Sequence, residues 1–276
     1  WDWGGGRYSL WSGIGLPIAL KIGMAGFKQL LAGAEAMDQH YRTTPLEHNL
    51  PVLLAMTGIW NINILGLKAQ TILPYDGRLK TLPNYLSQLE MESNGKTVTS
   101  DGSRTARDTS PVIWGDVGAN AQHAYFQLLH QGTPAFYADF IVPVRRTPSN
   151  GYSKDTQVQL HSQQELNLAN CIAQSRVLMM GDSVLQWEDS CEKSPDRLYS
   201  GNHPSTTIMF DELTPYSLGS LIALYEHKVY TQAVIWDINP FDQWGVELGK
   251  QIAKTTLKAI QQRQQAMADD EHFDAS

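Results

Sequence analysis

The repeating structural unit of this protein is clearest in the stretch Pro111-Val-Ile-Trp-Gly-Asp-Val-Gly-Ala-Asn-Ala-Gln-His-Ala-Tyr-Phe-Gln-Leu-Leu129. Residues 111–114 form a short apolar run, which is typical of a buried strand. After a polar loop, apolar residues recur at the spacing of one helical face, at Ala121, Ala124, Tyr125, Leu128 and Leu129. The stretch therefore predicts a strand followed by a helix.

The same unit recurs along the chain. Four further apolar runs predict strands, at residues 71–73, 135–142, 206–210 and 233–236. Helical patterns separate or flank them, at residues 27–38, 45–65, 79–89, 165–180 and 214–225 and from residue 242 onward. Strands that alternate with helices predict an α/β fold, here a doubly wound, parallel, five-stranded sheet flanked by helices.

Composition limits the classes of partner. The formal net charge of −7 is spread along the 276 residues without a basic patch, which argues against nucleic acid. No uninterrupted apolar run approaches the length of a membrane span, so we expect no membrane partner. Two cysteines cannot form a disulfide framework, and we expect Cys171 to be a core residue and the compartment to be the cytoplasm.

Two polar residues are candidates for proton transfer. Glu92 lies where a helix gives way to the Asn94-Gly95 turn, and a carboxylate fixed there can act as a general base. The alternative is an ordinary surface glutamate. His123 is expected in the first turn of its helix, where the helix N-terminus keeps an imidazole neutral and suited to proton exchange. A histidine hydrogen-bonded in a loop is an equally good interpretation.

The segment Phe241-Asp-Gln-Trp-Gly-Val-Glu-Leu-Gly-Lys250 follows the last predicted strand. We interpret Asp242 as the N-cap of a helix that places Gln243, Glu247 and Lys250 on one face. Ligands of open α/β sheets bind at this end of the strands. A solvated helix face is the simpler alternative.

Other motifs are weaker. The spacing of the eight histidines suggests no metal site. Gly4-Gly-Gly6 matches neither the dinucleotide fingerprint nor the phosphate-binding loop. Gly181-Asp182-Ser183 is similar to a hydrolase nucleophile segment, but it follows a helix and is interpreted as a helix-ending turn.

Five segments together resemble the phosphoglucose isomerase family, the glucose-6-phosphate isomerases. The first and last of them are the family's two signatures, at residues 2–15 and 233–250. Between them stand Met-Glu-Ser-Asn-Gly-Lys96, Gln-His-Ala-Tyr-Phe-Gln-Leu-Leu-His-Gln-Gly132 and Leu-Ile-Ala-Leu-Tyr-Glu-His-Lys228, in the family's order.

The resemblance implies two sugar-isomerase (SIS) type domains in a complete, homodimeric enzyme. Residues 1–20 then resemble the closing edge of a first domain, residues 21–268 the second domain, and residues 269–276 an acidic, disordered tail. In the family, an earlier segment binds the substrate's phosphate. We therefore interpret the chain as a fragment and expect it to be nearly inactive alone.

The resemblance also implies roles for single residues. Glu92 resembles the base that moves a proton between C1 and C2, and Arg7 resembles the cation that stabilises the enediolate-like intermediate. His123 and Lys250 resemble the ring-opening groups, with the histidine donated by the neighbouring subunit. Three residues match positions that line the substrate site: Gly6, Gln88 and Gln243. Glu247 has no family role and is expected to support Lys250 or the helix.

The expected activity is interconversion of glucose 6-phosphate and fructose 6-phosphate, in glycolysis and gluconeogenesis, through a cis-enediol(ate). It requires neither a metal nor another cofactor. Departures from the family pattern at Gly4, Ala119, Ala121 and residues 145–162 affect the fine geometry. The alternative is a sugar-phosphate-binding SIS module without catalysis, which would not need the base and the ring-opening pair together.

Overall fold

The computed structural model describes residues 4–146, 151–184 and 194–274, with side chains through residue 264. Contacts divide the chain into two units, Trp1–Pro240 and Phe241–Ser276. The first unit is an α/β domain, in which four parallel strands form a sheet in the order β2-β1-β3-β4. The strands are β1 (Ala69–Pro74), β2 (Val112–Gly115), β3 (Phe136–Arg145) and β4 (Ser205–Glu212).

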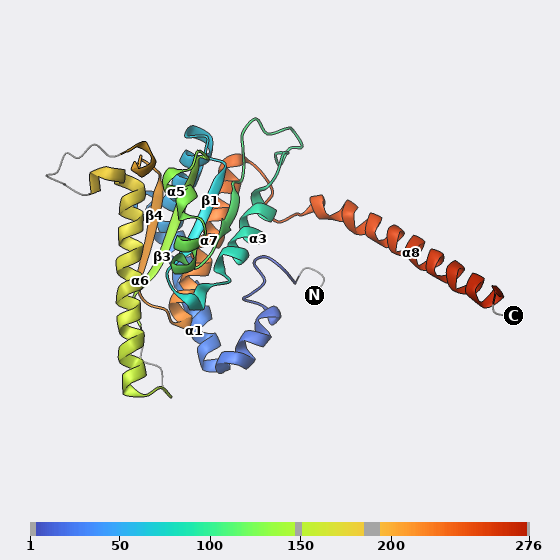
Figure 1. Cartoon of the computed structure of the whole chain (residues 1–276), viewed down its shortest axis with the longest axis horizontal. Coiled ribbons are helices and arrows are strands. Elements are labelled where there is room, and N and C mark those ends of the chain that lie inside the picture. Colours follow the sequence, from blue (N-terminus) through green and yellow to red (C-terminus); the bar gives the residue numbers. More distant parts are fainter. Residues whose placement is uncertain (1–3, 147–150, 185–193, 275–276) are drawn as a thin grey trace. The chain divides into compact units, whose positions relative to one another are not determined.

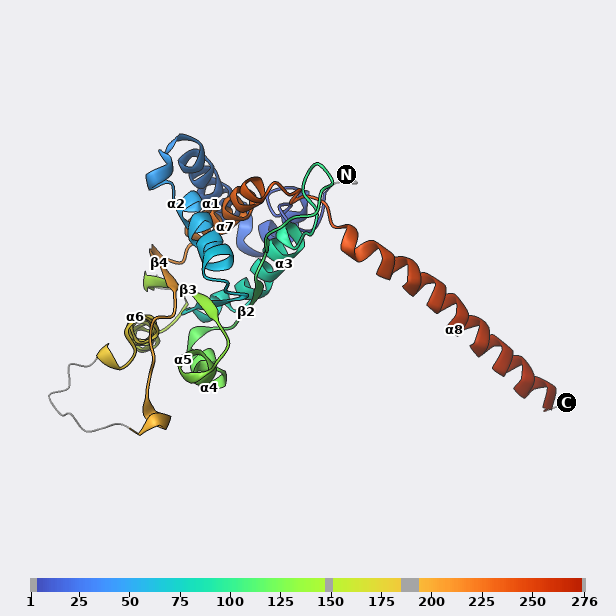
Figure 2. The same cartoon turned by 90° about the horizontal axis from the view of Figure 1, so that it is seen from above.

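Seven α-helices of the first unit flank this sheet (Figure 1). They are α1 (Leu16–Thr43), α2 (Leu50–Ile59), α3 (Leu82–Asn94), α4 (Gly118–Ala124), α5 (Phe126–Gln131), α6 (Lys154–Met180) and α7 (Pro215–Trp236). Viewed from above, α1, α2, α3 and α7 lie on one side of the sheet, and α4, α5 and α6 lie on the other (Figure 2).

Alternate strand residues supply the two cores, because successive side chains of a strand point to opposite faces. Ile72 and Ile141 pack with leucines of α3 and α7. Leu73 and Phe140 pack with a second cluster from the helices of the opposite face, which includes Cys171. Cys171 is fully buried, as expected, and burial raises the pKa of its thiol to about 12.

The fifth predicted strand is wrong. Ala233-Val-Ile-Trp236 forms the last turn of α7, and the described residues contain four strands in this sheet. Ala233 and Trp236 are buried while Val234 and Ile235 are exposed, which is a helical pattern of burial. The beginning of α7 is as predicted, because Thr214 accepts from the amide of Ser217 in a capping box before Pro215.

Helix bounds differ from the predictions at several points, most clearly in the predicted helix 120–129 and in α6. The predicted helix 120–129 is two helices, because Tyr125 leaves the helical region (φ −148°, ψ 7°) and packs its ring 4.4 Å from that of Trp114. Helix α6 begins at Lys154 rather than at residue 165, and Ser153 is its N-cap. Residues 189–203 are expected from their polar composition to form an irregular loop. Their described part, residues 194–203, contains a 3₁₀ turn at Pro195–Arg197, while residues 185–193 lie outside the described part.

Two glycines bring α1 close to α7. A Cβ on Gly33 would lie 1.9 Å from the carbonyl oxygen of Tyr216, and one on Gly219 would lie 2.0 Å from that of Leu30. By length and composition alone, the helical stretch Gly13–Thr43 is long and apolar enough to cross a membrane. Its second half packs on α7, where Ser220 donates to the carbonyl oxygen of Gly33 at 2.7 Å, and the expectation of no membrane partner stays a prediction.

The described part of the second unit contains a 3₁₀ turn at Trp244–Val246, followed along the chain by one long helix, α8 (Glu247–Asp274). Asp242 is therefore not the N-cap of this helix, and Gln243 precedes it. The helix also extends into the tail predicted to be disordered. The predicted domain boundaries at residues 20 and 268 remain predictions, although residues 4–20 and 21–240 belong to one unit.

Candidate active site

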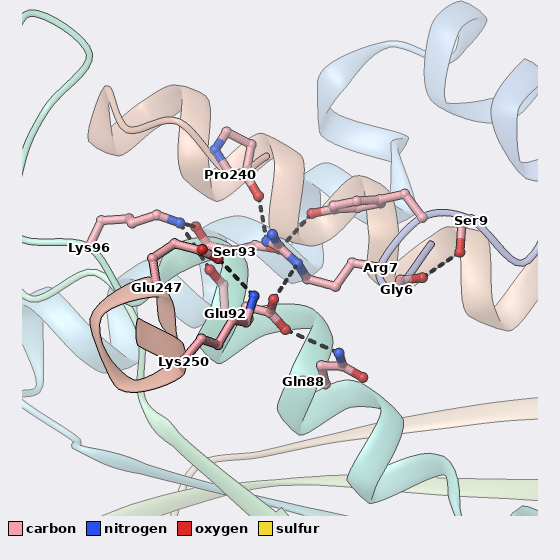
Figure 3. A network of polar contacts seen from close by, with 11 residues as sticks. Gly6, Arg7, Ser9, Gln88, Glu92, Ser93, Lys96, Pro240, Glu247 and Lys250 are labelled. Atoms are coloured by element: carbon pink, nitrogen blue, oxygen red, sulfur yellow. Dashed lines mark hydrogen bonds and ion pairs between the residues drawn. The ribbon is translucent and has the colours of Figure 1, made fainter. Parts of the chain in front are cut away.

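Arg7 lies in an irregular segment whose backbone is shaped by its neighbours. Gly6 has φ 68°, a region that favours glycine, and its carbonyl oxygen accepts from the Ser9 hydroxyl at 2.6 Å. The guanidinium of Arg7 donates to Ser93 Oγ at 2.8 Å and to the carbonyl oxygen of Pro240 at 2.7 Å. Only 6% of the side chain is exposed, so the charge is held in one place (Figure 3).

Glu92 faces this guanidinium from the last turn of α3. Its Oε1 lies 3.6 Å from Arg7 Nε, and its Oε2 accepts from Gln88 Nε2 at 3.1 Å. The glutamate side chain remains 23% exposed. One carboxylate thus has a cation beside one oxygen and an amide beside the other (Figure 3), and its side chain is accessible to solvent.

Local sequence fixes the end of α3. Lys96 Nζ donates to the carbonyl oxygens of Glu92 and Ser93 at 2.9 and 2.8 Å, which satisfies acceptors that a helix C-terminus leaves open. Asn94 is buried and donates to the carbonyl oxygen of Val229 in α7, at 3.1 Å. The segment Met91–Lys96 therefore holds Glu92 at a rigid helix end, as its sequence predicts.

The group formed by Arg7, Gln88 and Glu92 suits proton transfer next to a developing negative charge. An accessible carboxylate can take and return a proton on a carbon. A fixed guanidinium stabilises the anion that forms when the proton leaves, and it does so without reorganising. Of the predicted site residues, the structure brings together these three and the adjacent Gly6.

His123 lies elsewhere in the domain. It is exposed in the last turn of α4, not in the first turn, so the argument from a helix N-terminus is wrong. Gly118 begins this helix against the ring of Tyr75, where a Cβ would lie 2.2 Å from the ring. Ala121 of α4 belongs to the second core cluster, whereas α3 belongs to the first. His123 and Glu92 are therefore on opposite faces of the sheet.

Lys250 and Gln243 belong to the second unit. Lys250 Nζ donates to Glu247 Oε1 at 2.7 Å, an i,i+3 pair on α8 whose side chains are 58% and 45% exposed. Gln243 lies before the 3₁₀ turn, so the predicted common helical face holds for Glu247 and Lys250 and not for Gln243. The catalytic role of Lys250 stays a prediction.

Sequence reasoning missed the residues that hold Arg7 and Glu92 in place. Ser93 accepts from Arg7, and its hydroxyl lies 2.9 Å from that of Tyr8. Glu226 of α7 accepts from Trp11 Nε1 at 2.7 Å and from the Tyr85 hydroxyl at 3.0 Å. The position of a single serine in a sequence does not indicate its partner. Glu226 lies within one of the segments that resemble the family, and its signal is a charged residue in an otherwise apolar helical pattern.

The structure tests one of the weaker motifs. Gly181-Asp182-Ser183 is the helix-ending turn that was predicted, with Gly181 at φ 57° directly after α6. Within the described residues, no three His, Cys, Asp or Glu side chains gather as a metal site would require.

Comparison with known proteins places the whole chain in one family. The phosphoglucose isomerase family model matches residues 1–276. Glucose-6-phosphate isomerase 2 of Chromohalobacter salexigens is 62% identical over 266 residues, covering 96% of this chain and 47% of that protein. Glucose-6-phosphate isomerase of Psychrobacter cryohalolentis is 57% identical over 272 residues, covering 98% of this chain and 48% of that protein.

A solved structure agrees with these relatives. The crystal structure of a glucose-6-phosphate isomerase from Chlamydia trachomatis matches with a TM-score of 0.80 at 38% identity, over 92% of this chain and 47% of that one. The chain spans about half the length of the curated relatives it matches. The chain belongs to the phosphoglucose isomerase family.

Proposed function

We propose that this chain is part of an enzyme that interconverts glucose 6-phosphate and fructose 6-phosphate. The observation that carries the proposal is the 3.6 Å approach of Arg7 Nε to Glu92 Oε1 beside Gln88, in a chain of this family. Relatives named glucose-6-phosphate isomerase, 55–62% identical over nearly all of this chain, support the same reaction.

In the proposed reaction Glu92 removes a proton from C2 of the open-chain aldose and returns it to C1, while a proton passes from O2 to O1. The intermediate is a cis-enediol(ate), and Arg7 stabilises its negative charge. One carboxylate serves both carbons because they are bonded to each other. Gly6 and Gln88 line the proposed sugar site next to this pair, and Gln243 is a further proposed substrate-binding residue.

Ring opening precedes the proton transfer, and we assign it to His123 and Lys250. The positions of His123 and Glu92 on opposite faces of one sheet support a role for the histidine in the active site of a neighbouring subunit. The proposed assembly is therefore a homodimer in which each site combines Glu92 of one chain with His123 of its partner.

Binding of the substrate's phosphate is assigned to sequence beyond this chain. The chain spans about half of its relatives, and we propose that the parallel sheet described here is the second of two SIS-type domains in a longer protein. Because phosphate binding orients the sugar for attack, the 276-residue chain alone should show almost no turnover. We assign the complete protein to cytoplasmic glycolysis and gluconeogenesis.

The test is Glu92→Gln in the full-length protein, which keeps the shape of the side chain and removes the base. We expect kcat for fructose 6-phosphate to fall by at least about 100-fold, the usual contribution of a general base. The matched control is Glu35→Gln, an exposed glutamate of α1, which should retain wild-type activity.

Calorimetric titration with fructose 6-phosphate completes the test. The Glu92→Gln variant should still bind the sugar phosphate. A wild-type protein that binds fructose 6-phosphate but does not isomerise it would instead be a non-catalytic SIS module. Near-normal turnover by Glu92→Gln would exclude the proposed base.

A further inference from the structure

Arg7 is fixed in a segment that has no helix or strand of its own. Residues 4–12 form turns, and both neighbours of Arg7 have positive φ, 68° at Gly6 and 61° at Tyr8. The value at Gly6 is ordinary for glycine, but Tyr8 carries a Cβ that is strained in this region. Such a backbone persists only where surrounding contacts hold it, so other side chains must maintain the position of Arg7.

Two aromatic side chains anchor the segment. The Tyr8 hydroxyl lies 2.9 Å from Ser93 Oγ on α3, and Trp11 Nε1 donates to Glu226 Oε2 on α7 at 2.7 Å. The other oxygen of Glu226 accepts from the hydroxyl of Tyr85 on α3, at 3.0 Å. One carboxylate therefore joins three elements: the Arg7 segment, α3 and α7.

The hydrogen bonds that Glu226 accepts offset the cost of its partial burial. Burial raises the pKa of its carboxyl to about 7, and the hydrogen bonds from Trp11 and Tyr85 act in the opposite direction. Asp38, on α1, also raises it. Glu226 is half-buried, where a carboxylate without partners would be costly, and it has two donors at hydrogen-bonding distance.

We propose, on the basis of the proposed isomerase function, that Glu226 is a positioning residue for the Arg7–Glu92 pair. Tyr85 and Glu92 stand seven residues apart on α3, which is about two turns, so both lie on the same side of that helix. Glu226 holds this helix through Tyr85 and the Arg7 segment through Trp11. It thereby sets the distance between the cation and the base without itself touching the substrate.

Three variants of the full-length protein test the proposal. Trp11→Phe keeps an aromatic ring, although a smaller one, and removes the indole N–H donor, whereas Glu226→Ala removes the acceptor. Both should lower kcat about tenfold or more while KM stays within about threefold, because the loss falls on the transition state. Glu226→Gln should restore kcat to within about threefold of wild type, since its amide oxygen can accept from Trp11 while its NH₂ donates to the Tyr85 hydroxyl.

The control is Trp60→Phe, which changes an exposed tryptophan outside the site and should leave kcat unchanged. Far-UV circular dichroism separates loss of fold from loss of position, and Trp11→Phe remains informative if Glu226→Ala does not fold. A wild-type protein without isomerase activity would contradict the proposed function. An active wild type with full kcat in Trp11→Phe, or with equal losses in Glu226→Gln and Glu226→Ala, would contradict the positioning role.

Discussion

At the scale of single residues, the site depends on the shape of Arg7 as much as on its charge. One terminal nitrogen of the guanidinium donates to Ser93 Oγ and to the Pro240 carbonyl oxygen, while Nε faces Glu92. A lysine ammonium is a single point and cannot reproduce this geometry. In the full-length protein we therefore expect Arg7→Lys to lower kcat by about 100-fold, as loss of a fixed donor to a developing anion does.

Steady-state kinetics with glucose 6-phosphate would measure this loss. Arg145→Lys is the matched control, because Arg145 forms an exposed ion pair with Asp211 at the end of β3 and has no place in the site. An Arg7→Lys variant with wild-type kcat would mean that positive charge alone is sufficient there.

At the scale of secondary-structure elements, a buried polar layer joins the sheet to α7. Asp139 of β3 accepts from Gln70 Nε2 at 2.8 Å and from the Tyr225 hydroxyl at 2.9 Å. Beside it, Lys228 and Glu90 form an ion pair of 2.5 Å between α7 and α3. This layer fixes α3, and therefore Glu92, against the sheet.

Asp139 makes the stability of this layer depend on pH. Burial raises the pKa of its carboxyl from 3.8 to about 6, against the effect of Lys228. Between these values the folded protein binds more protons than the unfolded one, so the contribution of Asp139 to stability falls as pH rises from about 4 to 6. Asp139→Asn removes this effect, and the free energy of unfolding of the variant minus that of wild type should rise by about 2 kcal/mol over that range.

Urea unfolding at pH 4.5 and at pH 7 would measure the change. Asp211→Asn is a control of opposite sign, because the hydrogen bond and charge of Arg145 lower the pKa of Asp211. For Asp211→Asn, the free energy of unfolding of the variant minus that of wild type should fall as the pH rises. A difference for Asp139→Asn that stays constant with pH would show that Asp139 is ionised throughout.

The same elements show what the sequence could predict. Patterns of apolar residues found all four strands, and Thr214-Pro215, an N-cap followed by a first-turn proline, marked the beginning of α7, because both signals are local in the sequence. Ala233–Trp236 was misread because four apolar residues fit a strand and a buried helix equally well, and only the preceding turns of α7 distinguish them. The approach of Arg7 to Glu92 joins residues far apart in the chain, so resemblance to a family could suggest it and periodicity could not.

At the scale of the whole molecule, the position of His123 bears on assembly. The histidine and Glu92 lie on opposite sides of the sheet within one chain, and in the proposed homodimer a site that uses both draws them from two chains. Two inactive variants, Glu92→Gln and His123→Ala, should then complement each other when co-expressed. In a mixed dimer, one site combines the intact Glu92 of one chain with the intact His123 of the other.

Random pairing makes half of the dimers mixed, and each mixed dimer has one intact site of two. We therefore expect about one quarter of wild-type activity from the co-expressed pair. Glu92→Gln with Arg7→Lys is the matched negative control: both residues come from the same chain, so no mixed dimer contains an intact site. Recovery in the first pair alone would establish that the histidine crosses between subunits, whereas no recovery in either pair would place Glu92 and His123 in the same chain's site.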